Sequence, residues 1–178
     1  MKNQVLFGFF ILIISCTKEN NIKQSVGPKK ERFDYYENFL SNNVEERDIE
    51  VWLPGGYDQT QSLPVLYMFD GQNIYHGIRG WDKKQYNHGW QVDETLDSLF
   101  SKGNIPQMIV VGVHNIGKKR YSEYTPAKPK SLVKKRMSNA DIWFREVYDK
   151  HDITSDKFLK FLVEELKPFI DRNYKICC

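Results

Sequence analysis

One short segment constrains the fold more than any other part of the chain. It is a run of apolar, strand-forming residues at positions 63–69 that leads directly into Asp-Gly-Gln-Asn at positions 70–73. Because the run lacks polar alternation and Pro64 and Gly71 bound it, it predicts a β-strand buried on both faces. Asp-Gly is also typical of a hairpin turn. No second strand follows it, however, so the pattern favours a functional loop at the carboxyl end of a strand.

The residues after this loop predict a second strand that lies parallel to the first. Residues 90–102 carry apolar side chains at helical spacing, and Gly103 ends the helix. Asp93 and Glu94 lie in its first turn, where negative charge complements the helix dipole, so we interpret them as structural rather than as a catalytic pair. The apolar run at 107–114 is the second strand. A strand, a helix and a strand in this order form a βαβ unit.

Further elements flank this unit. Residues 47–53 alternate, with Ile49, Val51 and Leu53 on one face, and predict a strand paired with residues 38–41. Residues 127–152 show no regular spacing of apolar residues, although 140–148 predicts a short helix. Thr154 or Ser155 then caps a last amphipathic helix. We expect Leu159 to widen its apolar stripe and Pro168 to bend it or mark its last turns. The predicted fold class is therefore α/β.

The first residues form a targeting segment. Lys2 precedes an apolar stretch at 5–14 that is too short to span a bilayer, and Ser15 precedes Cys16. This arrangement resembles a bacterial lipoprotein signal, in which cleavage precedes a cysteine that is then lipidated. The alternative is a secretory signal that happens to contain a cysteine. The resemblance implies a cell-envelope location and a membrane partner through the lipid anchor.

The domain plan follows from this segment. We predict a signal peptide at residues 1–16, a polar flexible tether at 17–32 and one folded domain at 33–178.

Composition excludes several classes of protein. The chain has 40% apolar and 14% aromatic residues, so it is not a disordered chain, and its net charge of +3 gives no support for nucleic-acid binding. The basic stretch at 128–136 is interpreted as a solvated loop, with a phosphate- or membrane-contacting patch as the alternative. Cys177 and Cys178 are adjacent, and the four histidines fit no zinc spacing. We therefore expect no structural disulfide, metal or cofactor.

Six motifs in a fixed order carry a family resemblance. They are Leu-Pro-Gly-Gly-Tyr-Asp (53–58), Asp-Gly-Gln-Asn (70–73), Trp-Gln-Val-Asp-Glu-Thr-Leu (90–96), Ile-Val-Val-Gly-Val (109–113), Glu-Tyr-Thr-Pro (123–126) and Leu-Lys-Pro-Phe-Ile-Asp-Arg-Asn-Tyr (166–174). Together they resemble the esterase D and enterochelin-esterase type of esterases among the α/β-hydrolases. The resemblance implies a three-layer sandwich around a mostly parallel sheet. It also implies a Ser-His-Asp site that cleaves small-molecule carboxylic esters.

The resemblance assigns a role to the loop after the first apolar strand. Esterases of this kind stabilise the developing oxyanion with two backbone N–H groups, and one of them comes from this loop. The candidates are Gly71, Gln72 and Asn73. The N–H of Gln72 is the best match, with Gly71 permitting the close backbone approach. The Asp70 carboxylate is better suited to fixing the loop than to chemistry.

The catalytic triad, in contrast, has no match in these residues. No Gly-x-Ser-x-Gly sequence occurs, and His76, His88, His114 and His151 do not match the triad base. We therefore expect an N-terminal part of a hydrolase domain that lacks the triad and does not cleave esters as it stands. We also expect the strand at 107–114 to expose a long apolar edge, which predicts poor solubility.

Two other functions remain open at this stage. The chain could be a non-catalytic surface lipoprotein that binds a glycan through an aromatic loop comprising Tyr75, Trp81, Tyr86 and Trp90, although such loops also simply cover sheet edges. A glycosidase that uses carboxylates such as Asp70 and Glu123 is a more distant alternative.

Overall fold

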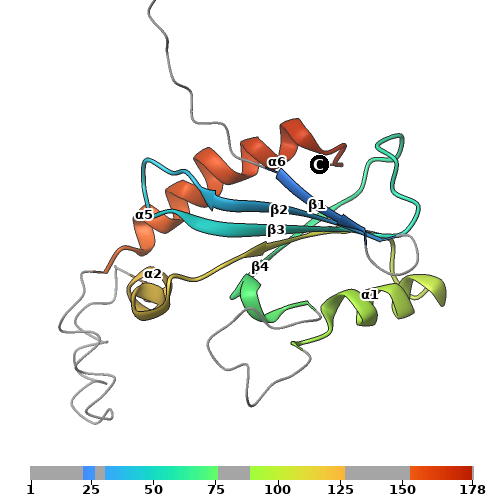
Figure 1. Ribbon diagram of the computed structural model, residues 1–178, viewed down its shortest axis with the longest axis horizontal. Helices are drawn as coiled ribbons and strands as arrows, with labels where there is room; N and C mark the ends of the chain where they lie inside the picture. Colours follow the sequence, from blue (N-terminus) through green and yellow to red (C-terminus); the bar gives the residue numbers. More distant parts are fainter. Residues whose placement is uncertain (1–21, 27–30, 76–88, 127–152, 178) are drawn as a thin grey trace, which may run out of the picture.

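A mixed β-sheet with helices on both faces forms the described part of the chain (Figure 1). The computed structural model describes residues 22–26, 31–75, 89–126 and 153–177. The strands are β1 (Ile22–Val26), β2 (Arg32–Phe39), β3 (Arg47–Leu53), β4 (Val65–Phe69) and β5 (Ile109–Val113), in the spatial order β1-β2-β3-β5-β4.

The predicted βαβ unit is present. β4 and β5 pair in parallel, from Val65 opposite Ile109 to Phe69 opposite Val113. Helix α1 (Val92–Ser101) lies between them in sequence. The other three pairings within the described residues are antiparallel, so the parallel share of the sheet is smaller here than the resemblance implied.

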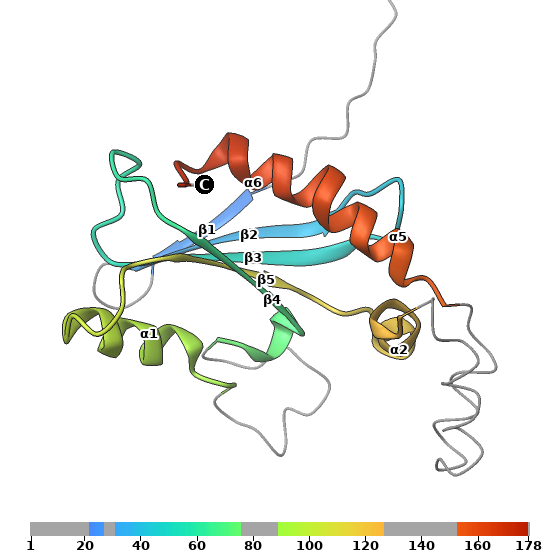
Figure 2. The same cartoon turned by 180° about the vertical axis from the view of Figure 1, so that it is seen from behind.

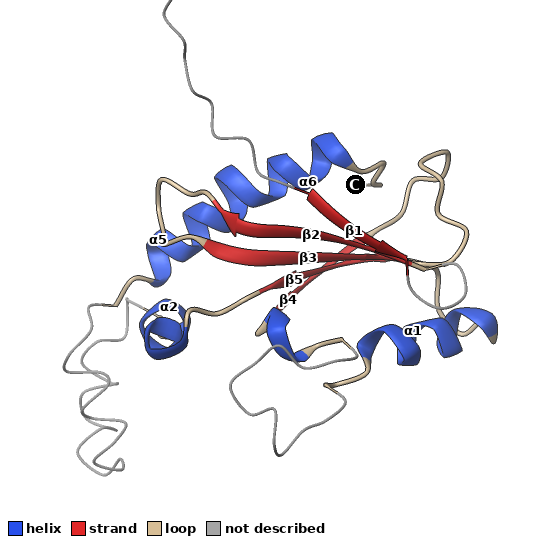
Figure 3. Cartoon of the chain, in the orientation of Figure 1, coloured by secondary structure: helices blue, strands red, loops and turns tan. Residues whose placement is uncertain are grey.

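The helices lie on opposite faces of the sheet and form a three-layer sandwich (Figures 2 and 3). One face packs against the C-terminal helices, through Phe158, Phe161, Leu166 and Ile170. The other packs against α1, through Leu96. The prediction of an α/β fold with a partial hydrolase sandwich is confirmed.

The alternation in β3 divides its side chains between these two cores. Ile49, Val51 and Leu53 share one face, as predicted, and this face packs against the C-terminal helices. Trp52, on the opposite face, is fully buried against Phe100, and its Nε1–H donates to Glu31 Oε2 at 2.7 Å. β3 is therefore buried on both faces, because each face of the sheet is covered by a helix.

The sheet begins earlier than the sequence predicted. β1 pairs antiparallel with β2, from Ile22 opposite Tyr36 to Val26 opposite Arg32. The predicted tether at 17–32 thus contains a strand, because a polar segment can add to a sheet edge through its backbone alone. The predicted signal peptide, Cys16 and the predicted helix at 140–148 lie outside the described residues.

The exposed edge of the sheet is β4 rather than the strand at 107–114. β5 lies between β3 and β4, and each of its residues is buried. β4 has no second neighbour among the described residues, and Leu66 and Phe69 remain 39% and 42% exposed. The expectation that 63–69 is buried on both faces is therefore wrong. Both strands are apolar runs, and such a run does not reveal which strand lies inside the sheet.

One continuous helical segment closes the chain. It consists of α5 (Ser155–Lys160), the π-helical segment η3 (Phe161–Leu166) and α6 (Lys167–Asn173). Thr154 occupies the predicted N-cap position but makes no side-chain cap hydrogen bond. Pro168 falls at the start of α6, directly after the π-helical turns, so the helix continues past it. Leu159 is exposed, so the apolar stripe is narrower than predicted.

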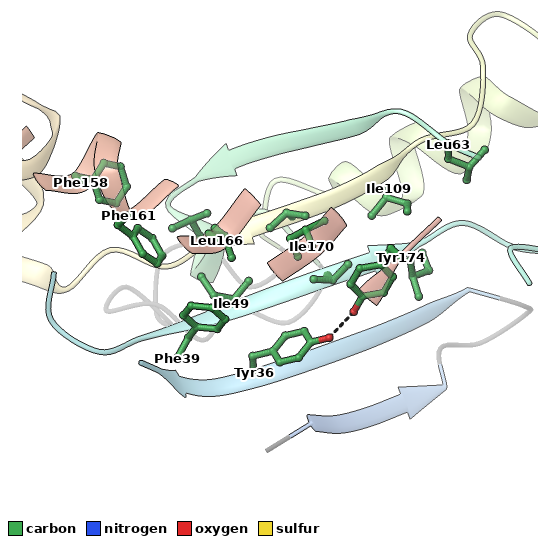
Figure 4. Packing of buried hydrophobic residues seen from close by; sticks show 14 residues of the cluster. Tyr36, Phe39, Ile49, Leu63, Ile109, Phe158, Phe161, Leu166, Ile170 and Tyr174 are labelled. Atoms are coloured by element: carbon green, nitrogen blue, oxygen red, sulfur yellow. Dashed lines mark hydrogen bonds between the residues drawn. The ribbon is translucent and has the colours of Figure 1, made fainter. Parts of the chain in front are cut away.

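A buried hydrogen-bond chain fastens the end of this helix to β2 (Figure 4). Tyr174 Oη donates to Asp34 Oδ2 at 2.9 Å, and the Tyr36 and Tyr174 hydroxyl oxygens lie 2.7 Å apart. Since Tyr174 has only one hydroxyl proton, Tyr36 donates to Tyr174.

In the part of the chain that the structure describes, no helix combines the length and apolarity needed to cross a bilayer.

Candidate functional site

The predicted functional loop lies at the carboxyl ends of β4 and β5. Asp70 follows β4 in a left-handed conformation (φ 58°, ψ 40°) and starts the 3₁₀ turn η1 (Gly71–Asn73). A left-handed backbone is uncommon for a residue other than glycine and costs about 1–2 kcal/mol. The N–H of Asn73 donates to the Asp70 carbonyl at 2.8 Å, which closes the turn.

Gly71 lies against the backbone of β5. A Cβ at this position would lie 2.6 Å from the Gly112 carbonyl carbon and 2.8 Å from the Val113 nitrogen. Since these are backbone atoms of a central strand, they cannot move aside cheaply. The absence of a side chain at Gly112 also permits this close approach, because a Cβ there would lie 3.3 Å from Gly71 Cα. The loop therefore requires glycine at position 71 for close packing.

The Asp70 carboxylate is the centre of a polar cluster. Arg120 donates to both of its oxygens, from Nε to Oδ1 at 2.7 Å and from Nη2 to Oδ2 at 2.6 Å. Asn115 Nδ2 donates to Oδ1 at 2.7 Å, and Tyr124 Oη donates to the same oxygen at 3.4 Å. Burial acts to raise the pKa of Asp70, but the hydrogen bonds and charge of Arg120 and the hydrogen bond from Asn115 outweigh it, so the pKa is lowered. Asp70 is thus ionised at neutral pH.

The three oxyanion candidates differ in what their N–H groups do. Asn73 has its N–H engaged by the Asp70 carbonyl, and its own carbonyl accepts from the Trp90 N–H at 2.8 Å. Gly71 and Gln72 donate to no backbone carbonyl within the described residues. This is the ordinary state of the first N–H groups of a helical turn, which have no intrahelical acceptor. The side chain of Gln72 is held separately, since its Oε1 accepts from the Asn115 N–H at 3.1 Å.

Sequence reasoning did not anticipate several residues around the loop. Asn115 and Arg120 join it from the segment that follows β5. His114 directly follows β5 and lies beside Gly71, and its Nε2 lies 3.7 Å from Glu50 Oε2. The sequence does hold a signal for Arg120, which lies three residues before the Glu-Tyr-Thr-Pro motif at 123–126.

The side chains predicted for the two alternative functions, glycan binding and glycoside cleavage, are engaged in other contacts where the structure describes them, with the exception of Trp90. Tyr75 is buried, and its hydroxyl donates to the Val110 carbonyl at 2.9 Å, so it is not available as a sugar platform. Trp90 is exposed, whereas Trp81 and Tyr86 lie outside the described residues. Glu123 forms a buried ion pair with Arg47 at 2.6 Å, and Asp70 is paired with Arg120. Both carboxylates proposed for a glycosidase are thus neutralised by arginine.

A three-layer α/β sandwich with a glycine-containing loop after a parallel strand places the protein in the class of α/β-hydrolase folds. Comparison with known families agrees. The family described as "Putative esterase" matches residues 41–177, and the chain belongs to this esterase family.

Comparison with solved structures gives weaker likenesses. A ferulic acid esterase from Anaeromyces mucronatus, solved with ferulic acid, has 20% identity and a TM-score of 0.47, over 86% of this chain and 47% of the other. The BES protein from Bacillus cereus has 20% identity and a TM-score of 0.49, over 86% of this chain and 50% of the other. The chain thus spans about half the length of these structures. No curated protein matches the chain.

Proposed function

We propose that this chain forms the oxyanion-binding part of a carboxylic-ester hydrolase. Membership of the esterase family supports this class of reaction. The observation that carries the proposal is the state of the loop: among described residues, the Gly71 and Gln72 N–H groups donate to no backbone acceptor, while Gly71 holds the loop against β5.

The chemistry follows from what ester cleavage requires. When a nucleophile attacks the ester carbonyl, the carbonyl oxygen becomes negatively charged. N–H groups held in place before the reaction stabilise this charge without having to reorganise. We assign the Gln72 N–H as the principal donor of this loop. Its direction is fixed because η1 and the Gly71 contact hold the backbone on both sides.

The nucleophile, acid and base are assigned to none of these residues. The sequence contains no Gly-x-Ser-x-Gly, and His114, the one histidine in the described residues, lies buried beside Glu50 at the end of β5. We therefore propose that the 178 residues alone do not hydrolyse esters, and that turnover requires a form of the protein that also carries a nucleophile elbow.

The first experiment is to resequence the gene through and beyond codon 178. We expect a reading frame that encodes Gly-x-Ser-x-Gly followed by an acid and a histidine. Protein expressed from it should hydrolyse p-nitrophenyl acetate, and the 178-residue chain should not. A clean stop with no such frame, together with a cooperative melt and glycan binding by the purified chain, would favour the non-catalytic lipoprotein instead.

The assignment of Gln72 has its own test in the esterase-active form. Gln72→Pro removes the N–H and should lower kcat about a hundred- to a thousandfold. Gln72→Ala keeps the N–H and removes only the side-chain contact with Asn115, so it should retain most activity. Turnover that survives in a folded Gln72→Pro variant would show that the donor is elsewhere.

We also propose that Cys16 is lipidated and holds the protein in the bacterial cell envelope, since the first residues resemble a lipoprotein signal. Each buried CH₂ of an attached chain contributes about 0.8 kcal/mol to membrane binding. Cys16→Ala should therefore move the protein from the membrane fraction to the soluble fraction. Unchanged membrane retention would contradict the anchor.

A further inference from the structure

The short helix α2 (Arg120–Tyr124) connects the candidate oxyanion loop to the core of the domain. It follows β5 through the 3₁₀ turn η2 (Gly117–Lys119). Arg120 and Tyr124 contact Asp70, and Glu123 contacts Arg47 on β3. The helix therefore has one set of contacts with the loop and another with the core.

The contacts with the core hold α2 firmly. Arg47 and Glu123 form two hydrogen bonds, at 2.9 Å and 2.6 Å, and both side chains are buried. The Arg47 guanidinium lies over the rings of Phe158 and Phe161, 5.1 Å and 5.2 Å from their centroids. The Ser122 carbonyl accepts from the Thr154 N–H at 2.9 Å, which joins α2 to the start of α5. A buried, paired cation of this kind resists displacement.

The contacts with the loop converge on one carboxylate. The guanidinium fork of Arg120 binds both oxygens of Asp70, a geometry that a lysine ammonium cannot reproduce. The side chain of Asn115 donates to the same carboxylate. The backbone N–H of Asn115 donates to the side-chain oxygen of Gln72. Tyr124 also stacks on Phe69, the last residue of β4, with ring centroids 5.2 Å apart.

These contacts hold a backbone conformation that Asp70 would not otherwise favour. A non-glycine residue in the left-handed region persists only where its surroundings over-determine it. If the carboxylate were released, Asp70 could relax toward an ordinary conformation. Because Gly71 and Gln72 follow directly, the relaxation would turn their N–H groups.

We propose that Arg120 is a positioning residue for the esterase site: through Asp70 it fixes the direction of the Gly71 and Gln72 N–H groups. This inference rests on the proposed function, because it assigns a purpose to the position of those N–H groups. Arg120 itself acts through Asp70 and has no assigned contact with the substrate.

Amide hydrogen exchange on the 178-residue chain tests the positioning directly. The reporter is the Asn73 N–H, which donates to the Asp70 carbonyl, and the reference is the Ile109 N–H, which donates to the Pro64 carbonyl at 2.9 Å. Arg120→Met should accelerate exchange at Asn73 about tenfold and leave Ile109 unchanged. Arg120→Lys should give a smaller acceleration. The matched control is Lys119→Met, which removes the neighbouring surface cation paired with Glu45 and should change neither amide.

Unchanged exchange at Asn73 in Arg120→Met would overturn the proposal, and so would acceleration of Asn73 and Ile109 by the same factor, which would mean a general structural role. In the esterase-active form, Arg120→Met should lower kcat without raising KM, as for an interaction that matters in the transition state. A KM effect alone would also contradict positioning. Absence of ester turnover in every form would count against the proposed function only, because the exchange result does not depend on catalysis.

Discussion

At the scale of single residues, the Arg47–Glu123 pair is the strongest candidate for a stability determinant. Both side chains are buried, and Arg47 lies among the aromatic rings of the C-terminal helices. Glu123→Gln would leave Arg47 as a buried cation without its counter-charge. We expect the free energy of unfolding to fall by about 3–5 kcal/mol, measured by urea denaturation.

Two further variants separate this effect from loss of packing. The double replacement Arg47→Met with Glu123→Leu removes both charges and should recover most of the lost stability. Asp171→Asn breaks the exposed pair with Lys167 and should cost less than about 0.5 kcal/mol. If Glu123→Gln unfolds at the same urea concentration as the original chain, the buried pair does not carry the stability assigned to it.

Single residues also show which part of the site sequence reasoning can reach. The loop at Asp70 and Gly71 was predictable because apolar strand and loop-forming residues adjoin in the sequence. The pairing of Asp70 with Arg120 was not, because the two residues are 50 positions apart and no local pattern records their contact. The expected loop-fixing role of Asp70 agrees with its contacts, whereas the partners came from the structure.

At the scale of elements, α1 contains a carboxyl group whose charged form is made unfavourable by burial. Asp93, in the first turn of α1, is buried. Burial, the hydrogen bond and charge of Glu94, and the charge of Glu31 raise the pKa of Asp93 from 3.8 to about 7. The folded chain therefore binds a proton more tightly than the unfolded chain, and stability decreases as pH rises from 3.8 to about 7.

Asp93→Asn should remove this pH dependence, because asparagine is neutral throughout. We expect the variant to be more stable than the original chain at pH 8, by up to about 4 kcal/mol for a rise in pKa from 3.8 to about 7, and the difference to shrink toward pH 4. Thermal melts across this range measure it. Asp97→Asn, an exposed carboxylate on the same helix, is the control and should change the profile little. Equal melting temperatures for Asp93→Asn and the original chain at pH 8 would show that Asp93 carries no such penalty.

The same elements show where prediction of the fold succeeded. β4 and β5 were predictable from their unbroken apolar runs, and α1 and the last helix from the helical spacing of their apolar residues; a βαβ unit also has only one common handedness. The position of β1 and the order of β4 and β5 were not. β1 joins the sheet by backbone pairing of a polar segment, and the order depends on contacts between distant strands.

At the scale of the whole molecule, the edge at β4 decides how the 178-residue chain behaves in solution. Residues 175–177 reach this edge only near Leu63, where the Cys177 N–H donates to the Leu63 carbonyl at 3.0 Å. Along β4 itself the described residues provide no second neighbour, and Leu66 and Phe69 are partly exposed. An apolar strand edge with unpaired backbone groups promotes association between copies.

We therefore expect the chain to form concentration-dependent oligomers, measured by size-exclusion chromatography with light scattering. Leu66→Lys places a charge on the edge strand and should raise the monomer fraction, since natural edge strands use lysine in this way. Val163→Lys adds the same charge at a 62% exposed position on the C-terminal helix and should not. If the two variants behave alike, net charge rather than the β4 edge controls association. A chain that stays monomeric at every concentration would show that the edge is protected.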